Sequence, residues 1–224
     1  MEPRSILPAV GDRRARLTRS AVEACFGRLS AGSGAPTGPD EFGRRGDHTL
    51  NPDFRLEGPF ARAAVLVPLI DRPEGIAVLF TQRTAHLHAH AGQISFPGGR
   101  IDPRDSDAVA TALREAEEEV GIPRDRVAVI GRLDTYWTRT GFEITPIVAF
   151  VDPAAEFRAD PFEVEEIFEV PLDFLADTIN HQRHSREFQG KLRYFYAMPW
   201  ERRIIWGATA GMLVNLAELL REVR

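Results

Sequence analysis

Apolar residues cluster in short unbroken runs in the middle of the chain and recur at helical spacing near its two ends. Short apolar runs bounded by turn residues are typical of buried strands, whereas apolar residues three and four apart indicate amphipathic helices. This pattern predicts strands at 63–69, 76–80, 127–133, 144–151 and 167–170. It predicts helices at 14–29 and 208–223, with a short helix starting at 171–178.

The first sixty residues differ in composition from the rest of the chain. Residues 31–39 are mostly Gly, Pro, Ser and Ala, which is linker composition, and residues 40–57 are polar and Gly-rich. We therefore expect an N-terminal extension at 1–57, made of a short helix and this linker, followed by one domain at 58–224 that includes the C-terminal helix. Mixed strands and helices predict an α/β fold with a sheet between helices.

Carboxylates gather on one side of a further helix that follows Gly98-Gly99 and ends before Pro123. At about 100° per residue, Glu115, Glu118 and Glu119 lie within an arc of roughly 100°, beside an apolar stripe. Like charges at this spacing repel, and a hard cation such as Mg²⁺ or Mn²⁺ would offset the repulsion. The alternative is a solvated acidic surface, which is the interpretation we give to Glu117.

The same segment resembles the Nudix box. Seven residues match the second half of the box in register, namely Arg114, Glu115, Ala116, Glu118, Glu119, Gly121 and Ile122. The first half is one residue longer, and Asp105 or Ser106 stands where the box has its first Glu. The resemblance implies a Nudix-type α/β/α sandwich with a mixed sheet, a metal held by Glu115, Glu118 and Glu119, and hydrolysis of nucleoside diphosphates linked to another group.

A second segment, residues 79–99, resembles the signature of the coenzyme A pyrophosphatases. Seven positions match, namely Thr81, Arg83, Gly92, Phe96, Pro97, Gly98 and Gly99, whereas Phe80, Thr84 and His88 depart. The resemblance implies cleavage of CoA or acyl-CoA into adenosine 3′,5′-bisphosphate and 4′-phosphopantetheine or its acyl form. Two alternatives stay open: a Nudix hydrolase for NADH or ADP-ribose, and a catalytically silent Nudix domain that senses a ligand.

These resemblances assign roles to individual residues. Glu118 and Arg114 belong to the catalytic box, where Arg114 orients carboxylates, and Glu163 is our choice of general base, with Glu166 second. Substrate contacts are expected from Arg83, His88, Gly98 and Gly99, because arginine suits phosphate oxygens and glycine lets backbone approach closely. The structural alternatives are a surface salt bridge for Arg83 and a tight turn for Gly98-Gly99. For Glu163 and Glu166 the alternative is a solvent-facing acid.

Histidines and aromatic residues add weaker candidates. His86, His88 and His90 alternate as they would on a strand or loop, and we expect them to line the substrate pocket rather than to bind zinc. The rings of Tyr136, Trp137 and Phe142 could stack on adenine or could pack in the core.

Composition narrows the partners and the location. A net charge of −5 argues against broad nucleic-acid binding, and no apolar run reaches the roughly 18 residues of a membrane span. We expect a small-molecule substrate, no nucleic-acid or membrane partner, and a cytoplasmic protein, either monomer or homodimer. The single cysteine, Cys25, is expected to pack in the core.

Overall fold

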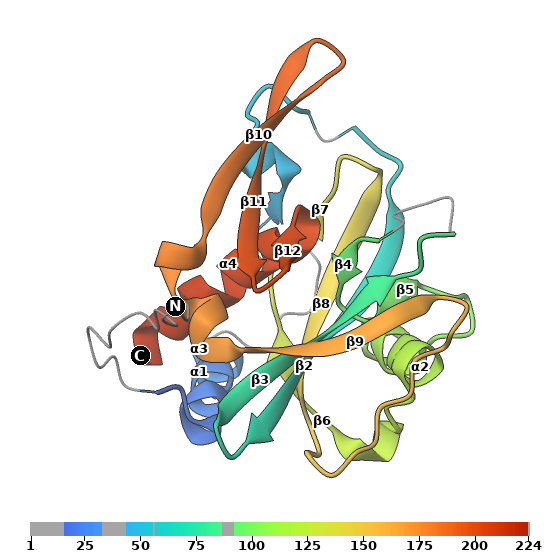
Figure 1. Ribbon diagram of the computed structural model, residues 1–224, viewed down its shortest axis with the longest axis vertical. Helices are drawn as coiled ribbons and strands as arrows, with labels where there is room; N and C mark the ends of the chain where they lie inside the picture. The colour runs from blue at the N-terminus through green and yellow to red at the C-terminus, as the bar shows by residue number, and fades with distance from the viewer. Residues whose placement is uncertain (1–15, 33–43, 56, 87–91, 224) are drawn as a thin grey trace, which may run out of the picture.

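A computed structural model describes residues 16–32, 44–55, 57–86 and 92–223 (Figure 1). Its helices are α1 (Arg19–Gly32), α2 (Ala108–Val120), α3 (Leu172–Ala176) and α4 (Ala208–Leu220). The strands of the main sheet are β1 (Arg44–Gly46), β2 (Ala61–Arg72), β3 (Gly75–Arg83), β4 (Ile94–Ser95), β5 (Gly98–Arg100), β6 (Val127–Arg132), β7 (Thr135–Trp137), β8 (Phe142–Val151) and β9 (Val164–Pro171). Among the helices described, none is long and apolar enough to cross a membrane.

The centre of the main sheet is β2, which runs parallel to β8 over Ala61–Ile70 and antiparallel to β3 and β5. Strand β9 continues the sheet beyond β3, and β6 and β7 pair antiparallel with β8. Because helices cover both faces, the central strands are continuous apolar runs rather than alternating ones. The five strands predicted from these runs are present, and the expected α/β sandwich with a mixed sheet is confirmed.

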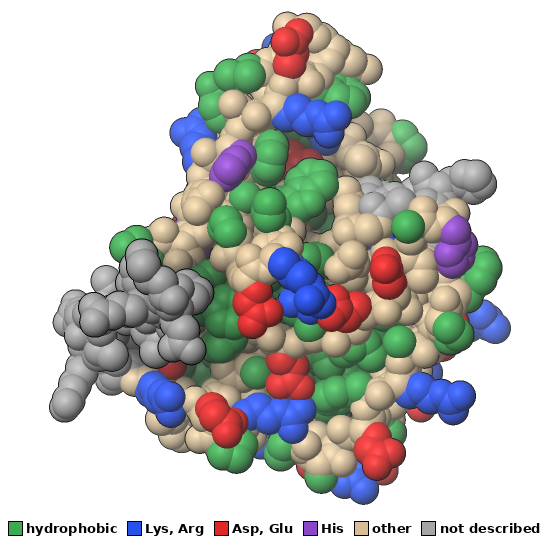
Figure 2. Space-filling model, in the orientation of Figure 1, with side chains coloured by type: hydrophobic (Ala, Val, Ile, Leu, Met, Phe, Trp, Pro, Cys, Tyr) green, Lys and Arg blue, Asp and Glu red, His purple; other side chains and the backbone are tan. Residues whose placement is uncertain are grey.

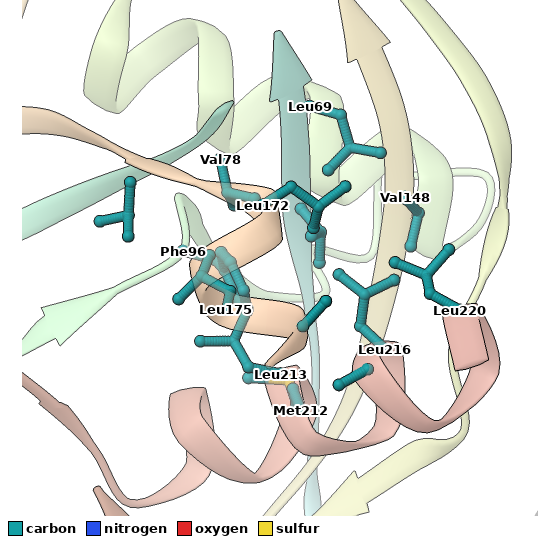
Figure 3. Close-up of a cluster of buried hydrophobic side chains, with 14 of the residues drawn as sticks. Leu69, Val78, Phe96, Val148, Leu172, Leu175, Met212, Leu213, Leu216 and Leu220 are labelled. Carbon is teal, nitrogen blue, oxygen red and sulfur yellow. The ribbon is translucent and has the colours of Figure 1, made fainter. Parts of the chain in front are cut away.

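Two hydrophobic clusters hold the layers together, one on each face of the sheet. The larger joins the sheet to α1, α3 and α4, and Figure 3 shows part of it, with Leu172, Leu175 and Leu216 among its labelled residues. The smaller packs Ala112, Ala116 and Val120 of α2 against the opposite face of β2 and β8. Among the described residues, α2 is the α-helix that packs on this face, and β5 and the 3₁₀ turn at Arg124–Arg126 lie next to it.

Helix α1 begins later than the sequence pattern predicts. Residues 16–18 are not helical, and the Thr18 hydroxyl accepts a hydrogen bond from the Ala21 N–H at 3.3 Å, as an N-cap does. The helix extends to Gly32, and most of the predicted linker lies outside the described residues. Val22, Cys25 and Phe26 are buried in the larger cluster, so the packing role expected for Cys25 is confirmed.

A second sheet, formed by β10 (Gln182–Phe188), β11 (Lys191–Trp200) and β12 (Arg203–Trp206), was not predicted. All seven residues of β10 are exposed and mostly polar, so the strand carries no apolar run. The β10–β11 hairpin projects from the body in Figure 1, and Figure 2 shows hydrophobic side chains on its visible face. Four large apolar side chains of this sheet are exposed: Phe188, Leu192, Ile204 and Trp206. The polar, Gly-rich segment 40–57 contributes β1 and a 3₁₀ turn at Asp47–Thr49 where it is described.

Candidate active site

Helix α2, whose acids lie along one edge, is capped at both of its ends. Asp107 caps the N-terminus by accepting a hydrogen bond from the Ala110 N–H at 2.8 Å. Gly121 ends the helix in the left-handed conformation, with a φ of 69°. Since Ala112, Ala116 and Val120 face the sheet, Glu115 and Glu119 lie beside the buried stripe, whereas Glu118 is more exposed. The arrangement predicted from helical periodicity is therefore present.

The glycines of β5 bring backbone against this edge. Gly99 pairs with Ala64 of β2, and a Cβ added to Gly99 would lie less than 3.0 Å from the Glu115 carboxylate. A Cβ on Gly98 would meet the backbone of Ala64 and Val65 at a similar separation. At Gly98 the clash is with backbone, so only a residue without a side chain fits there. At Gly99 the clash is with the end of the Glu115 side chain, so glycine leaves room for that carboxylate beside the sheet.

Glu119 is the most buried acid of the site, with 5% of its surface exposed. Its carboxylate accepts a hydrogen bond from the Gly98 N–H at 3.3 Å and lies 3.7 Å from the Arg83 guanidinium. The pKa of Glu119 is raised to about 8, chiefly by burial and also by the nearby charges of Glu115 and Glu163, while Gly98 and Arg83 oppose the shift. The protein therefore holds a carboxylate here whose negative charge is poorly compensated.

Arg114 holds a second group of acids together. Its guanidinium is 2.8 Å from Glu115, 3.1 Å from Glu118 and 2.9 Å from Asp105, which precedes the helix. The hydrogen bonds from Arg114 hold the pKa of Asp105 well below its usual range. Of the two residues that stand in for the first Glu of the box, Asp105 is thus the one bonded to Arg114. Sequence spacing alone left Asp105 and Ser106 open.

Arg83 links α2 to the loop before β9. One nitrogen of its guanidinium lies 3.7 Å from Glu119 and another lies 3.5 Å from Glu163, whose side chain is 42% exposed. Glu166 is placed differently, because Arg203 of β12 donates two hydrogen bonds to its carboxylate. The structure therefore brings Glu163, but not Glu166, into the group formed by Arg83 and Glu119.

The remaining candidates lie elsewhere or outside the description. His88 and His90 fall within residues 87–91, which are not described, and His86 packs near the Phe162 ring. The Tyr136 ring is buried, and its hydroxyl donates to Asp47 at 3.0 Å, so Tyr136 is a core residue here. Trp137 packs edge-on against Phe60, and the Arg100 guanidinium lies over the Phe142 ring. All three aromatic side chains thus contact other residues of the protein.

Comparison with protein families matches residues 60–189, more than half of the chain, to the NUDIX domain. The chain belongs to the Nudix family. It is 42% identical over 167 residues to the "Uncharacterized Nudix hydrolase NudL" of Photorhabdus laumondii. The aligned residues cover 75% of this chain and 89% of the relative. The protein of the same name from Escherichia coli K12 is 41% identical over 156 residues, or 70% and 81% of the two chains. A solved Nudix hydrolase from M. smegmatis, RenU, superposes with a TM-score of 0.48 at 20% identity, over 76% of this chain and 91% of that one.

As a Nudix hydrolase, the protein acts on nucleoside diphosphate derivatives, and enzymes of this family use divalent metal ions such as Mg²⁺ or Mn²⁺. The donors fit such an ion: Glu115, Glu118 and Glu119 supply carboxylate oxygens, and the charge of the buried Glu119 needs compensation. Their present positions do not form a finished metal centre. Within the described part of the chain, no three acidic, His or Cys side chains converge closely enough to hold a metal. Arg114 and Arg83 occupy the carboxylates instead.

Proposed function

We propose that this Nudix hydrolase cleaves the pyrophosphate bond of CoA or acyl-CoA, releasing adenosine 3′,5′-bisphosphate and 4′-phosphopantetheine or its acyl form. One observation carries the proposal. The segment that resembles the CoA pyrophosphatase signature, residues 79–99, also supplies the groups that touch the acids of α2. Arg83 and Gly98 contact Glu119, and Gly99 faces Glu115. These contacts between the signature segment and the acidic helix support the proposal of one shared site.

Metal binding is assigned to Glu115, Glu118 and Glu119. A divalent ion bound there would neutralise the anionic pyrophosphate and lower the pKa of a bound water molecule. Arg114 has the positioning role, because it already bonds to Glu115 and Glu118 and is itself held by Asp105. Releasing part of this ion-pair network would free carboxylate oxygens for the metal without unfolding the helix.

The phosphate groups are assigned to Arg83 and to the backbone of Gly98 and Gly99. The guanidinium of Arg83 has a planar fork that matches phosphate oxygens, and it reaches both Glu119 and Glu163. An incoming phosphate would compete with these two acids for Arg83. Substrate binding would thereby release the carboxylates that metal binding and catalysis require.

Glu163 is the proposed general base. Its side chain is 42% exposed, so water reaches it, and it lies next to the Arg83 guanidinium, as Glu119 does. Glu166 is the weaker candidate, because its carboxylate is taken up by Arg203. A base on the loop before β9 would be close to the metal-binding acids but separate from them. It could take a proton from the attacking water while the three acids keep the metal bound.

Selectivity for the 3′-phosphate of CoA is assigned to His88, because Arg83, which lies beside Glu119, is assigned to the phosphates of the scissile bond. Neutral histidine is a weaker phosphate partner than arginine, and its charge changes near pH 6–7. Preference for CoA over 3′-dephospho-CoA should therefore be modest and grow below about pH 6.5. His88→Arg should sharpen it.

We further propose that residues 58–224 form the hydrolase domain and residues 1–57 an extension. Part of that extension packs on the domain, since Phe26 of α1 is buried in the larger cluster and β1 pairs with β7. The proposed partner is a small molecule alone, and the proposed location is the cytoplasm.

Product analysis tests the proposal. The purified protein is incubated with CoA, NADH and ADP-ribose in Mg²⁺ or Mn²⁺, and the products are separated by chromatography, with a chelator in the control. We expect 4′-phosphopantetheine and adenosine 3′,5′-bisphosphate from CoA, and none in chelator. Rapid cleavage of NADH or ADP-ribose with CoA intact would contradict the CoA assignment, and no turnover of any substrate would favour a ligand-sensing domain.

A further inference from the structure

The loop that carries Glu163 is bonded at its start to the C-terminal end of α2. The Arg158 N–H donates to the Val120 carbonyl and the Asp160 N–H to the Glu119 carbonyl, both at 2.9 Å. Asp160 then organises the loop, since its carbonyl accepts from the Glu163 N–H at 3.1 Å and its carboxylate accepts from the Phe162 N–H at 2.9 Å. The backbone of Glu163 is thus tied to the backbone of Glu119.

The other side of the loop is held by Thr84, the residue after Arg83. The Thr84 N–H donates to the Glu163 carbonyl at 3.0 Å, and its hydroxyl donates to the Phe162 carbonyl at 2.9 Å. Thr84 is 7% exposed, so these bonds are shielded from water. The pairing of β3 with β9 shifts register at Gln82 and Arg83, which takes Thr84 out of the regular ladder and toward the loop.

We propose that Thr84 is a positioning residue for Glu163: its hydroxyl fixes the loop backbone so that the Glu163 carboxylate stays beside Arg83 and Glu119. The segment Arg83-Thr84 then holds the Glu163 side chain through Arg83 and the Glu163 carbonyl through the Thr84 N–H, and the Thr84 hydroxyl holds the preceding Phe162 carbonyl. Removing the hydroxyl leaves the Phe162 carbonyl without this shielded donor, which loosens the loop. This inference rests on the proposed role of Glu163 as general base and goes one step beyond it.

A double-mutant cycle with Glu163 separates positioning from general stability. Thr84→Val keeps the shape and removes the hydroxyl, and Thr84→Ser keeps the hydroxyl. We expect Thr84→Val to lower kcat about tenfold with little change in KM, and Thr84→Ser to stay within about twofold of the parent. In a Glu163→Gln background, Thr84→Val should change kcat by less than about twofold, because the group that it positions is already gone.

Thr138→Val is the matched control. Thr138 is also buried, and its hydroxyl bonds to Thr140 and Phe142 in the turn between β7 and β8. This variant should lose stability without the selective loss of kcat. The cycle is run on whichever of CoA, NADH or ADP-ribose is cleaved fastest, so its outcome does not depend on the substrate assignment.

Three results would overturn the inference. Thr84→Val could retain the full rate, or it could lose the same factor in both backgrounds, which would indicate a role independent of Glu163. A full rate in Glu163→Gln would remove the base that Thr84 is said to position, while leaving the CoA assignment standing. Failure of CoA turnover alone would remove the substrate assignment and leave the cycle valid.

Discussion

Glu119 is the residue on which the account of the site depends most. It is buried against β5, bonded to Gly98 and close to Arg83, and its pKa is raised to about 8. A carboxylate with these properties is costly to the protein unless a cation arrives, because burial disfavours its charged form. Two predictions follow from this single side chain.

The first concerns activity. Glu119→Gln keeps the size of the side chain but removes the charge, so kcat should fall by at least about 10²-fold, equivalent to ~2.7 kcal/mol of barrier. Glu118→Gln should act in the same direction. The control is Glu117→Gln, since Glu117 bonds to Arg124 outside the site and its side chain is half exposed. Steady-state kinetics at saturating Mg²⁺ measure the effect, and full turnover by Glu119→Gln would remove this residue from the metal site.

The second concerns stability against pH without metal. The pKa of Glu119 lies near 8 in the folded protein and near 4.5 when unfolded, so the folded state binds more protons between these values. The free energy of unfolding contributed by this group therefore falls as pH rises from about 4.5 to 8. Glu119→Gln should remove that fall. Relative to the parent protein, the variant should therefore be more stable at pH 8 than at pH 5.

Urea denaturation in chelator at several pH values measures this difference. Asp105, whose pKa is lowered by Arg114, acts below about pH 4 and in the opposite sense, so it does not disturb the comparison. If the free energies of unfolding of the parent and of Glu119→Gln changed with pH in parallel, burial would not raise the pKa of Glu119.

How far the sequence predicts individual residues depends on their separation along the chain. Glu115, Glu118 and Glu119 share an edge because they share one helix, and helical periodicity is enough to place them. Arg83 meets Glu163 across eighty positions, and Arg203 removes Glu166 from the site across thirty-seven. Arg83 and Glu163 are brought together by the pairing of β3 with β9, and Arg203 reaches Glu166 from the second sheet. Periodicity along the chain reveals neither contact.

At the scale of elements, β5 and α2 pack directly against each other at the site. The Gly99 position shows how closely they approach, because a side chain there would displace the Glu115 carboxylate. Gly99→Ala should therefore displace Glu115 and weaken Mn²⁺ activation at least about tenfold, with the overall fold retained. Gly27→Ala in α1, where a Cβ meets nothing within 4 Å, is the matched control. An unchanged Mn²⁺ activation constant in Gly99→Ala would show that the close packing of Glu115 is not needed.

The elements also show which signals the sequence lacks. Strands β2, β3 and β8 are apolar runs and were predicted, although each extends further than its run. Strand β10 is polar and wholly exposed, and it is held by pairing with β11 through a turn in which Gln189 and Gly190 have positive φ. Neither feature appears as a hydrophobic pattern. A strand supported on one side by its neighbour has no need of an apolar face.

At the scale of the whole molecule, the N-terminal helix belongs to the main core. The Phe26 ring packs where Gly131 of β6 has no side chain, and it is 2% exposed. Phe26→Ala should lower the free energy of unfolding by about 3–5 kcal/mol, because it opens a cavity between α1 and the sheet. Thermal or urea unfolding measures this, with the exposed Phe162→Ala as control. A loss below about 1 kcal/mol would indicate that α1 is an independent appendage.

Helix α2 and the segment of residues 79–99, which resembles the CoA pyrophosphatase signature, are proposed to form one site for CoA. The most direct measurement is kcat/KM for CoA, NADH and ADP-ribose, taken side by side in Mg²⁺. We expect kcat/KM for CoA to exceed the values for NADH and ADP-ribose by at least about tenfold, or ~1.4 kcal/mol of transition-state stabilisation. An inert CoA beside rapidly cleaved ADP-ribose or NADH would contradict it.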